Sequence, residues 1–436
     1  MTLKNSKQKL LFLLLFFWMF SPVLKIIAGF KVKTYIFTVI IPAILGSIKY
    51  FKYRKQTKVS NYTLIAMFTG FVYILIVEYI GILKGIIDFS FSKEYIIGFT
   101  VFFSAYYIVS KYKEYYIDDF IHKILLHLFY VGVIHSIIII LTVLIPDFTE
   151  LFYKFIWVTD KQERYLFGEV FNRRFSGFLD TGFASLSAIH ATLLAIGMYY
   201  LYEFNKKLNI KMVLLFLILF LVIFLSLIFI GRSGFIVLAV YIMTLSFIYL
   251  SKTINSMSIT YLTFKIFIFF IFFMVVFLFT FDFEKYETEV ASSFEFIINF
   301  METGKFSSYS TDIIFENQLI FPTEATELFF GTANFGRGTS IINSDLGMVY
   351  FVNGAGIIGT LIAFSCYFIL LFYAFRLRRI FKLMFYFILT FDILLILLNF
   401  KDLYFLAFSG ITKIFFIFLF IYHFIYLDKL EQRRKE

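Results

Sequence analysis

The chain alternates long apolar runs with short polar connections. Several windows of about twenty residues contain almost no charge, and an α-helix of that length crosses a hydrocarbon core roughly 30 Å thick. This length criterion predicts about twelve membrane-spanning helices. They lie near residues 10–28, 34–49, 61–83, 94–110, 123–145, 180–202, 211–230, 233–250, 262–281, 346–375, 381–399 and 403–427. We therefore expect an all-α polytopic membrane protein.

Two longer polar segments interrupt this pattern. They cover residues 146–179 and 282–344, and the second is the longest polar segment of the chain. Long connections are uncommon in compact proteins and are usually functional, and we expect the larger one to be partly helical. The sequence shows no internal repeat, coiled coil or low-complexity linker. It predicts one membrane domain, residues 1–436, with the two long polar segments on the same side of the membrane.

Composition supports this class and gives it an orientation. Hydrophobic residues make up 61% of the chain and charged residues only 16%. The net charge of +11 does not indicate nucleic-acid binding, because the basic residues gather in alternate short connections, as they do in cytoplasmic loops. The richer connections and the tail contain Lys49, Lys52, Arg54, Lys55, Lys58, Lys111, Lys113, Lys206, Lys207, Lys252, Arg376, Arg378, Arg379, Lys382, Lys429, Arg433, Arg434 and Lys435. Both termini are therefore predicted to be cytoplasmic, and both long polar segments to lie outside.

Little in the sequence indicates metal or redox chemistry. The single cysteine, Cys366, excludes an intramolecular disulfide. None of the five histidines lies in either long polar segment, and His190, within a predicted span, is more typical of a packing or hydrogen-bonding residue than of a base. There is no metal-ligand spacing or nucleotide-binding loop. We expect no metal and no cofactor. The N-terminal apolar run lacks a small-x-small cleavage site, so we expect a retained first span.

The most chemically dense stretch is Leu328–Thr360. Arg337 lies between two glycines there, and the apolar run that follows begins at Leu346. The hydroxyl, amide and carboxylate side chains in between belong to Thr339, Ser340, Asn343, Ser344 and Asp345. A polar cluster at a membrane boundary can face water, an anionic head group, or both. We interpret it as half of an active site.

Arginines mark three places on the predicted outer face. They are the pair Arg173–Arg174, then Arg232 on a short hairpin, and Arg337. Charges at a membrane boundary are costly unless they are paired or solvated, and a guanidinium binds phosphate oxygens with both arms. Three such groups converging on one outer cavity would suit a lipid-linked pyrophosphate. The alternative for each is a side chain that only reaches lipid phosphates; of the first pair we expect one functional residue.

Carboxylates near these arginines complete the candidate set. Asp180 and Asp345 each open an apolar run, so either could orient an acceptor hydroxyl or act as a general base, and either could equally cap a helix. Ser344, Asn343 and the intramembrane acid Glu78 are further acceptor-side candidates. Glu78 and Asp392, an acid in a later span, are also candidates for pairing with the arginines, and the alternative for both is a buried structural pair.

Three segments resemble conserved blocks of the O-antigen polymerase (Wzy) family. RRFSGFLDTGFASLSAIHATLLAIG is similar to the re-entry of that family's first outer loop, and FIGRSGFIVLAV to its hairpin between two spans. RGTSIINSDLGMVYFVNGAGIIGTLIAF resembles the block that closes its large periplasmic loop. The blocks follow the family's order over roughly residues 165–375, and the flanks match only in topology. The spacing from Arg337 to Gly347 matches the family's Arg…Gly pairs only approximately.

The resemblance implies a polymerase acting at the outer face of the bacterial cytoplasmic membrane. A growing glycan would leave undecaprenyl pyrophosphate and be transferred to the sugar of an incoming lipid-linked repeat unit. Arg174, Arg232 and Arg337 would hold the donor pyrophosphate and stabilise the leaving group, while Asp345 or Asp180 would handle the acceptor. Membrane lipid, a chain-length regulator and a flippase are the other implied partners, with no nucleic acid.

Other functions compete with this interpretation. The O-antigen ligase shares the topology, but its large loop typically carries a histidine, and residues 282–344 contain none. A lipid-linked oligosaccharide flippase should have short loops on both sides and charges along many helices. A structural membrane protein would not gather its polar residues at one face.

Topology can be measured directly. Because the loop charges orient the spans, a reporter fused after Tyr309 should report an external location, and one fused after Arg378 a cytoplasmic location. Paired alkaline phosphatase and green fluorescent protein fusions would distinguish the two. A cytoplasmic Tyr309 would overturn the placement of the whole candidate site.

Overall fold

The computed structural model describes most of the chain and is almost entirely helical. The described residues are 3–25, 31–52, 57–158, 175–178, 183–204, 210–231, 233–253, 295, 299–304, 318–335, 346–379, 382–401 and 410–435. Within these ranges, seven helical segments are long and apolar enough to cross a membrane. The predicted class, a multi-pass helical membrane protein, is confirmed. The count of twelve stays a prediction, and the span near residues 262–281 lies outside the described residues.

The chain divides into two compact units, each built from two separate stretches. The first unit comprises residues 1–38 and 111–298, and the second comprises residues 39–110 and 299–436. The first contains α1 (Leu3–Phe20), β1 (Val23–Lys25), β2 (Lys31–Lys33), α5 (Phe120–Leu144), α6 (Pro146–Phe155), α8 (Phe183–Phe204), α9 (Ile210–Ile230) and α10 (Ser233–Thr253). The second contains α2 (Ile41–Lys52), α3 (Lys58–Leu83), α14 (Ala325–Phe330), α15 (Gly347–Arg376), α16 (Lys382–Lys401) and α17 (Gly410–Lys435).

Short elements join some of these helices. α4 (Ser90–Tyr116) begins in the second unit and ends in the first, where a 3-10 turn, Ile117–Asp119, leads into α5. A π-helical turn, Ile36–Ile40, precedes α2, and Pro42 is the second residue of α2. Proline has no N–H to donate and its ring clashes with the carbonyl four residues earlier, which is consistent with a wider π-helical turn directly before it. The predicted span near residues 34–49 is therefore helical, with a change of helix type just before the proline.

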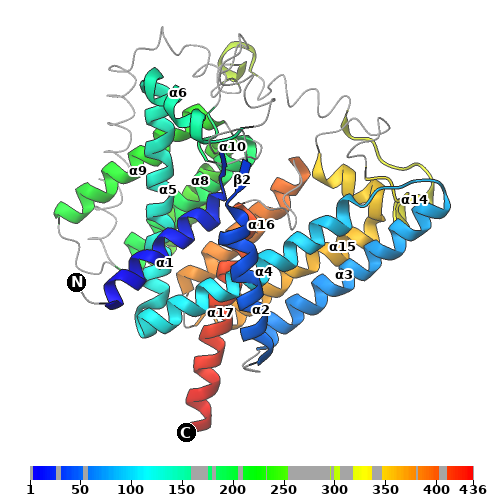
Figure 1. Ribbon diagram of the computed structural model, residues 1–436, viewed down its shortest axis with the longest axis horizontal. Coiled ribbons are helices and arrows are strands. Elements are labelled where there is room, and N and C mark those ends of the chain that lie inside the picture. Colours follow the sequence, from blue (N-terminus) through cyan, green and yellow to red (C-terminus); the bar gives the residue numbers. More distant parts are fainter. Residues whose placement is uncertain are drawn as a thin grey trace. The chain divides into compact units, whose positions relative to one another are not determined.

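In the first unit, α5, α8 and α9 pack against one another, and α10 packs on α8 (Figure 1). Two glycines permit the close approach of α5 and α8. A Cβ at Gly132 would lie 3.0 Å from the Cβ of Leu193, and one at Gly197 would lie 2.3 Å from the ring of Phe129. Between apolar membrane helices, attraction comes from van der Waals packing, which improves when small residues let backbones approach.

The first predicted span ends earlier than expected. A helix to Ala28 was predicted, but α1 ends at Phe20 and the chain turns into strand β1, which pairs antiparallel with β2. The cause is Pro22, because the residue before a proline is driven out of the helical region. Ser21, the residue before this proline, has left the right-handed helical region and has φ 42°.

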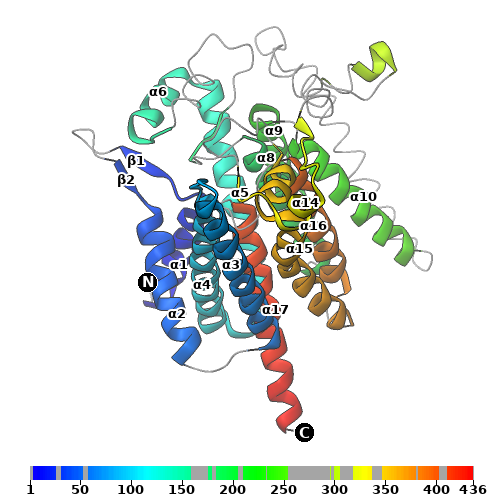
Figure 2. The same ribbon diagram turned by 90° about the vertical axis from the view of Figure 1, so that its right-hand side faces the viewer.

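In the second unit, α15 packs against α3, α14 and α16, and α3 lies beside α4 (Figures 1 and 2). Gly70 of α3 faces Tyr95 of α4 so closely that a Cβ there would lie 2.2 Å from the Tyr95 hydroxyl oxygen. Large apolar side chains on α3 remain exposed, among them Phe68, Leu75 and Tyr79. An exposed apolar face is expected where a helix meets lipid chains.

α15 is interrupted at Gly356, whose φ of 70° and ψ of 179° are not helical. The break leaves main-chain carbonyls without their usual helical donors, and the chain after α14 supplies replacements. The Thr332 N–H donates to Asn353 O at 2.7 Å, and the Ala333 N–H donates to Gly354 O at 3.0 Å. The Tyr73 hydroxyl of α3 donates to Ala355 O at 3.0 Å.

This break gives a direct test of the fold. A Cβ at Gly356 would lie 2.2 Å from Phe329 O, in a backbone region almost confined to glycine. Gly356→Ala should therefore lower the free energy of unfolding by more than about 3 kcal/mol, measured by thermal unfolding in detergent. Gly85→Ala is the matched control, because Gly85 also has positive φ, 81°, but nothing lies within 4 Å of its added methyl. Gly85→Ala should lower the free energy of unfolding by only about 1–2 kcal/mol. Equal losses would show that the α14–α15 contact is not tight.

Candidate functional site

Most of the predicted site residues lie outside the described residues. They are Arg173, Arg174, Asp180, Arg232, Arg337, Asn343, Ser344 and Asp345. Their predicted roles stay predictions. The chain on either side of these segments is described, however, and shows how each one is attached to the helices.

The polar segment 336–345 is anchored at both ends within the second unit. At its start, Phe335 is fully buried and stacks on Phe91 of α4 with ring centroids 4.2 Å apart. The Phe335 N–H donates to Asp88 Oδ2 at 3.2 Å. At its end, Leu346 is buried against Val349 in the first turn of α15. The described residues on both sides of this segment are therefore packed against α4 and α15.

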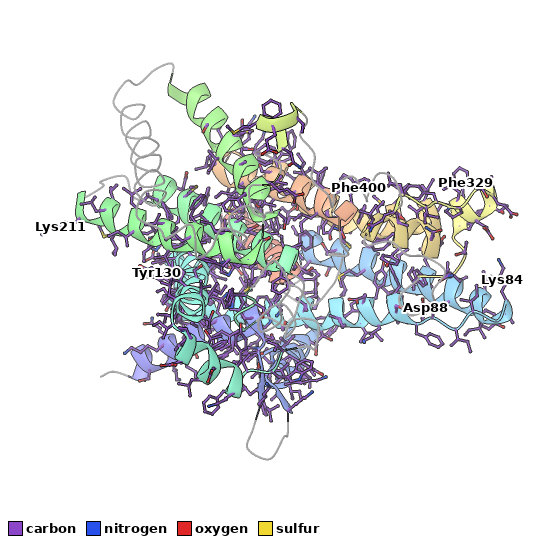
Figure 3. The ribbon with its side chains drawn as sticks, turned by 90° about the horizontal axis from the view of Figure 1, so that it is seen from above. Lys84, Asp88, Tyr130, Lys211, Phe329 and Phe400 are labelled. Carbon is purple, nitrogen blue, oxygen red and sulfur yellow. The ribbon has the colours of Figure 1, made fainter. Side chains whose placement is uncertain are left out.

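Asp88 joins this anchor to the start of α4. Its Oδ1 accepts the Ser90 N–H at 3.0 Å, so one carboxylate holds both the first residue of α4 and the residue before the polar segment. Figure 3 shows Lys84, Asp88 and Phe329 at the same end of this unit. This role of Asp88 was not predictable, because Asp88 lies in a short connection of ordinary length.

Asn353 is the second residue that sequence reasoning missed. Its side-chain amide donates to Ile320 O at 2.8 Å and to Val349 O at 2.8 Å. Its own main-chain carbonyl accepts from the Thr332 N–H and, at 2.9 Å, from the Thr332 hydroxyl. A single asparagine thus ties α15 to the chain before and after α14. The one feature of the sequence that could have indicated this role is the position of an amide side chain within a long apolar run.

Glu78 is the one predicted site residue that is described, and its surroundings indicate a capping role. It is buried on α3, and its Oε1 accepts the Ser92 N–H at 3.0 Å. Ser92 lies in the first turn of α4, where main-chain N–H groups lack intrahelical acceptors and a carboxylate is favoured. Glu78 Oε2 is buried without a hydrogen-bond partner among the described residues. The described contacts favour its structural alternative over contact with an acceptor.

Asp392 on α16 has a different environment. It is 1% exposed, and neither carboxylate oxygen has a hydrogen-bond partner among the described residues. A pair between Asp392 and an arginine is therefore not seen in this part of the chain.

A groove of about 270 Å³ runs between α3 and α14 in the second unit. Ile76, Val77 and Ile80 form an apolar wall, and Lys84 and Glu327 are the charged side chains that line it. It continues to Gly331–Ala333, the strand-like stretch that leads into Phe335. The groove therefore lies beside the start of the polar segment and combines apolar and charged surface.

In the first unit, the described neighbours of Arg174 and Arg232 are hydrogen-bonded to each other. The Phe175 N–H donates to Phe229 O at 3.1 Å, at the end of α9. On the other side of Arg232, Ser233 Oγ lies 2.8 Å from Ser187 Oγ, which belongs to α8. Two candidate arginine segments far apart in the sequence are therefore attached to the same end of the α8–α9–α10 group.

A buried hydrogen-bond chain lies behind residues 175–178. The Phe178 N–H donates to His135 Nε2 at 3.0 Å, so this nitrogen carries no proton, and in a neutral ring the proton lies on Nδ1. His135 Nδ1 therefore donates to His190 Nε2 at 2.8 Å, and His190 Nδ1 donates to Ser136 Oγ or Ser226 Oγ, each at 3.0 Å. All four side chains are 0% exposed.

This chain links α5, α8 and α9 to the turn that follows Arg174. The Ser226 hydroxyl donates a hydrogen bond to Ile223 O at 2.7 Å, so every nitrogen of the two imidazoles has a partner while both rings stay neutral. Gly177 has φ 55°, and a Cβ there would lie 2.6 Å from His135 Nε2. Neutral, satisfied groups are the form in which polar side chains are tolerated in a membrane interior. The hydrogen-bonding role expected for His190 is confirmed.

No group of three or more histidine, cysteine or acidic residues that could hold a metal ion occurs in the described part of the chain. Comparison with models of known protein families, with curated proteins and with solved structures gives no match. The fold by itself defines the class of this chain as a multi-pass helical membrane protein. A proposal about its activity has to be argued from its own residues.

The hydrogen-bond chain predicts a local effect of substitution. His135→Leu preserves volume but removes the acceptor of the Phe178 N–H, and a buried unsatisfied donor costs about 1–3 kcal/mol. Hydrogen–deuterium exchange of the peptide containing residues 175–178 should therefore become faster, by about tenfold for each 1.4 kcal/mol lost.

His122→Leu is the control for this experiment. His122 is also on α5 and is hydrogen-bonded to Tyr200 on α8, but it is not part of the chain that ends at Phe178. Exchange of residues 175–178 should stay unchanged in this variant. Unchanged exchange in His135→Leu as well would refute the proposed anchoring.

Proposed function

We propose that this chain is a metal-independent glycosyltransferase that polymerises lipid-linked oligosaccharide repeat units, an O-antigen-type polymerase of the bacterial cytoplasmic membrane. The observation that carries the proposal is the hydrogen bond between Phe175 and Phe229 in the first unit. Arg174 directly precedes Phe175, and Arg232 follows Phe229 by three residues. The described residues close to both arginines in the sequence are thus joined by one hydrogen bond, which supports the proposal that the two arginines share an anionic ligand.

A ligand that two guanidinium groups could bind together at a membrane boundary is a lipid-linked pyrophosphate. Each guanidinium can bind two phosphate oxygens and stays charged at any physiological pH. A pyrophosphate carries several negative charges, and its lipid chain keeps it in the membrane. The resemblance of the surrounding sequence to polymerase blocks points to the same ligand, undecaprenyl pyrophosphate bearing a glycan.

The proposed reaction is a displacement at the sugar carbon bonded to pyrophosphate. A hydroxyl of the incoming lipid-linked unit attacks that carbon, the bond from carbon to the pyrophosphate oxygen breaks, and a new glycosidic bond forms. The hydroxyl proton passes to a carboxylate, with Asp345 or Asp180 as the candidates. Negative charge grows on the leaving oxygen, and Arg174, Arg232 and Arg337 are the proposed groups that stabilise it.

The anchored ends of segment 336–345 support a role for Arg337 and Asp345. Catalytic groups need defined positions, and the segment is held at Phe335 by Asp88 and at Leu346 by the start of α15. The groove beside Lys84 adds an apolar wall with a cation at its end. This combination fits the first isoprene units and the phosphate of a carrier lipid.

The sharpest test of this function is at Arg337. If the residue binds pyrophosphate with both arms, Arg337→Lys keeps the charge but loses the two-armed geometry. We expect normal expression and membrane insertion with loss of most long-chain product, and essentially complete loss in Arg337→Ala. The measurement is a gel of extracted glycolipid beside an immunoblot, in cells that lack the native gene. The glycan should collapse from a ladder of lengths to a single repeat unit.

Arg378→Lys serves as the matched control. Arg378 follows the other end of α15, and its guanidinium carbon lies 3.9 Å from the centroid of the Phe375 ring. It should keep the full ladder. A full ladder from well-expressed Arg337→Ala would exclude a catalytic role for Arg337. Loss of even the single repeat unit from the surface would favour a ligase or a flippase instead.

A further inference from the structure

We infer that the first unit carries a second membrane-binding surface, an interfacial platform that binds anionic phospholipid head groups. The platform consists of α6, the β1–β2 hairpin and Trp157. It is independent of the proposed polymerase activity, because none of the candidate site residues belongs to it. The inference combines three observations: an exposed apolar stripe, a cluster of lysines, and the position of both at the end of a membrane-spanning helix.

The apolar stripe lies along α6. Phe148, Leu151 and Phe155 are spaced by three and four residues, so they share one face of α6. Leu144 is the last residue of α5, and the non-helical Ile145 separates it from α6. Leu144, Leu151 and Phe155 are about half exposed, at 49%, 53% and 56%. The opposite face is occupied, with Thr149 and Tyr153 buried in the unit.

The position of α6 relative to the membrane follows from its neighbour. α5 belongs to a segment long and apolar enough to span a membrane and ends at Leu144, and α6 starts at Pro146. The connection is Ile145 alone, so α6 must begin at the membrane boundary. A short amphipathic helix at that depth lies in the interface with its apolar face among acyl chains.

The lysines come from the hairpin, which is attached to the end of α6. The Trp157 N–H donates to Val23 O at 2.8 Å, and Leu24 bridges to Ile156. Lys25 Nζ donates to Tyr153 O at 3.1 Å. Figure 2 shows the hairpin and α6 side by side at this end of the unit.

The platform has an excess of positive charge, because Lys25, Lys31, Lys33 and Lys154 outnumber its two carboxylates, Asp147 and Glu150. Within the described residues, Lys25, Lys31 and Lys33 make no ion pair with a carboxylate. Lys31 Nζ lies 4.2 Å from the centroid of the Trp157 ring. A half-buried tryptophan beside lysines that have no carboxylate partner in the described part of the chain is typical of a lipid interface, where the indole lies at head-group level and the cations contact phosphates. Charge complementarity therefore selects an anionic lipid surface as the occupant.

Trp157 makes this surface measurable. The chain has two tryptophans, and Trp18 is fully buried, so Trp18→Phe leaves Trp157 as the only indole. The full-length variant is placed in nanodiscs in which either phosphatidylglycerol or phosphatidylcholine carries bromine near the head-group end of its acyl chains, at equal bromine content. Brominated phosphatidylglycerol should quench Trp157 fluorescence at least about twofold more strongly.

Variants assign the preference to the platform. Replacing Lys25, Lys31 and Lys33 by glutamine should bring the quenching ratio close to one. The matched control replaces Lys111, Lys113 and Lys123 by glutamine, which removes the same charge near the other end of α5. It should keep the twofold preference.

Two outcomes would overturn the inference. One is equal quenching by the two brominated lipids in the parent protein, and the other is a preference that survives the hairpin triple substitution. If Trp18→Phe does not give folded protein, the difference in fluorescence between the wild type and Trp157→Phe supplies the same signal. Lys31→Gln alone, which leaves the hairpin backbone intact, should reduce the preference measurably and replaces the triple variant if that one fails to fold.

Discussion

Main-chain carbonyls inside a membrane need hydrogen-bond donors, and the arrangement around α15 follows from this need. Gly356 interrupts the helix, and the carbonyls of Asn353 and Gly354 are then satisfied by Thr332 and Ala333. The chain after α14 is therefore held against α15 by backbone hydrogen bonds as well as by packing. In hydrocarbon each unsatisfied group would cost several kcal/mol. The start of the polar segment that contains Arg337 is thus fixed by a break in a helix that follows it in the sequence.

The apolar pattern predicted the long helices well. α3, α5, α9 and α15 begin and end within a few residues of the expected spans, because length and lack of charge suffice to define a membrane helix. The pattern failed where local backbone chemistry intervened. Pro22 ended the first helix before Ala28, and a hairpin follows it. The break at Gly356 was not predicted either, because a glycine within an apolar run usually indicates close packing between two helices.

The candidate site was predictable in part. Polar clusters at membrane boundaries drew attention to the segments around Arg174, Arg232 and Arg337, and the structure shows their described neighbours anchored to helix ends. The anchoring residues themselves were not predictable. Asp88 and His135 act through partners distant in the sequence, so no local spacing reveals them. The opposite happened at Glu78. As an acid within a predicted span it was a candidate site residue, but its described hydrogen bond caps the neighbouring helix α4.

The donors and acceptors in the buried hydrogen-bond chain from Phe178 to Ser226 are also defined. A main-chain N–H can only donate, so the proton positions on both imidazoles are dictated from one end. If the turn at residues 175–178 were to leave its place, His135 would be free to adopt the opposite tautomer, and His190 would follow. The tautomer of His190 therefore depends on whether the Phe178 N–H is hydrogen-bonded to His135. Nitrogen chemical shifts of the two rings can report, from inside the membrane, on the chain next to Arg174.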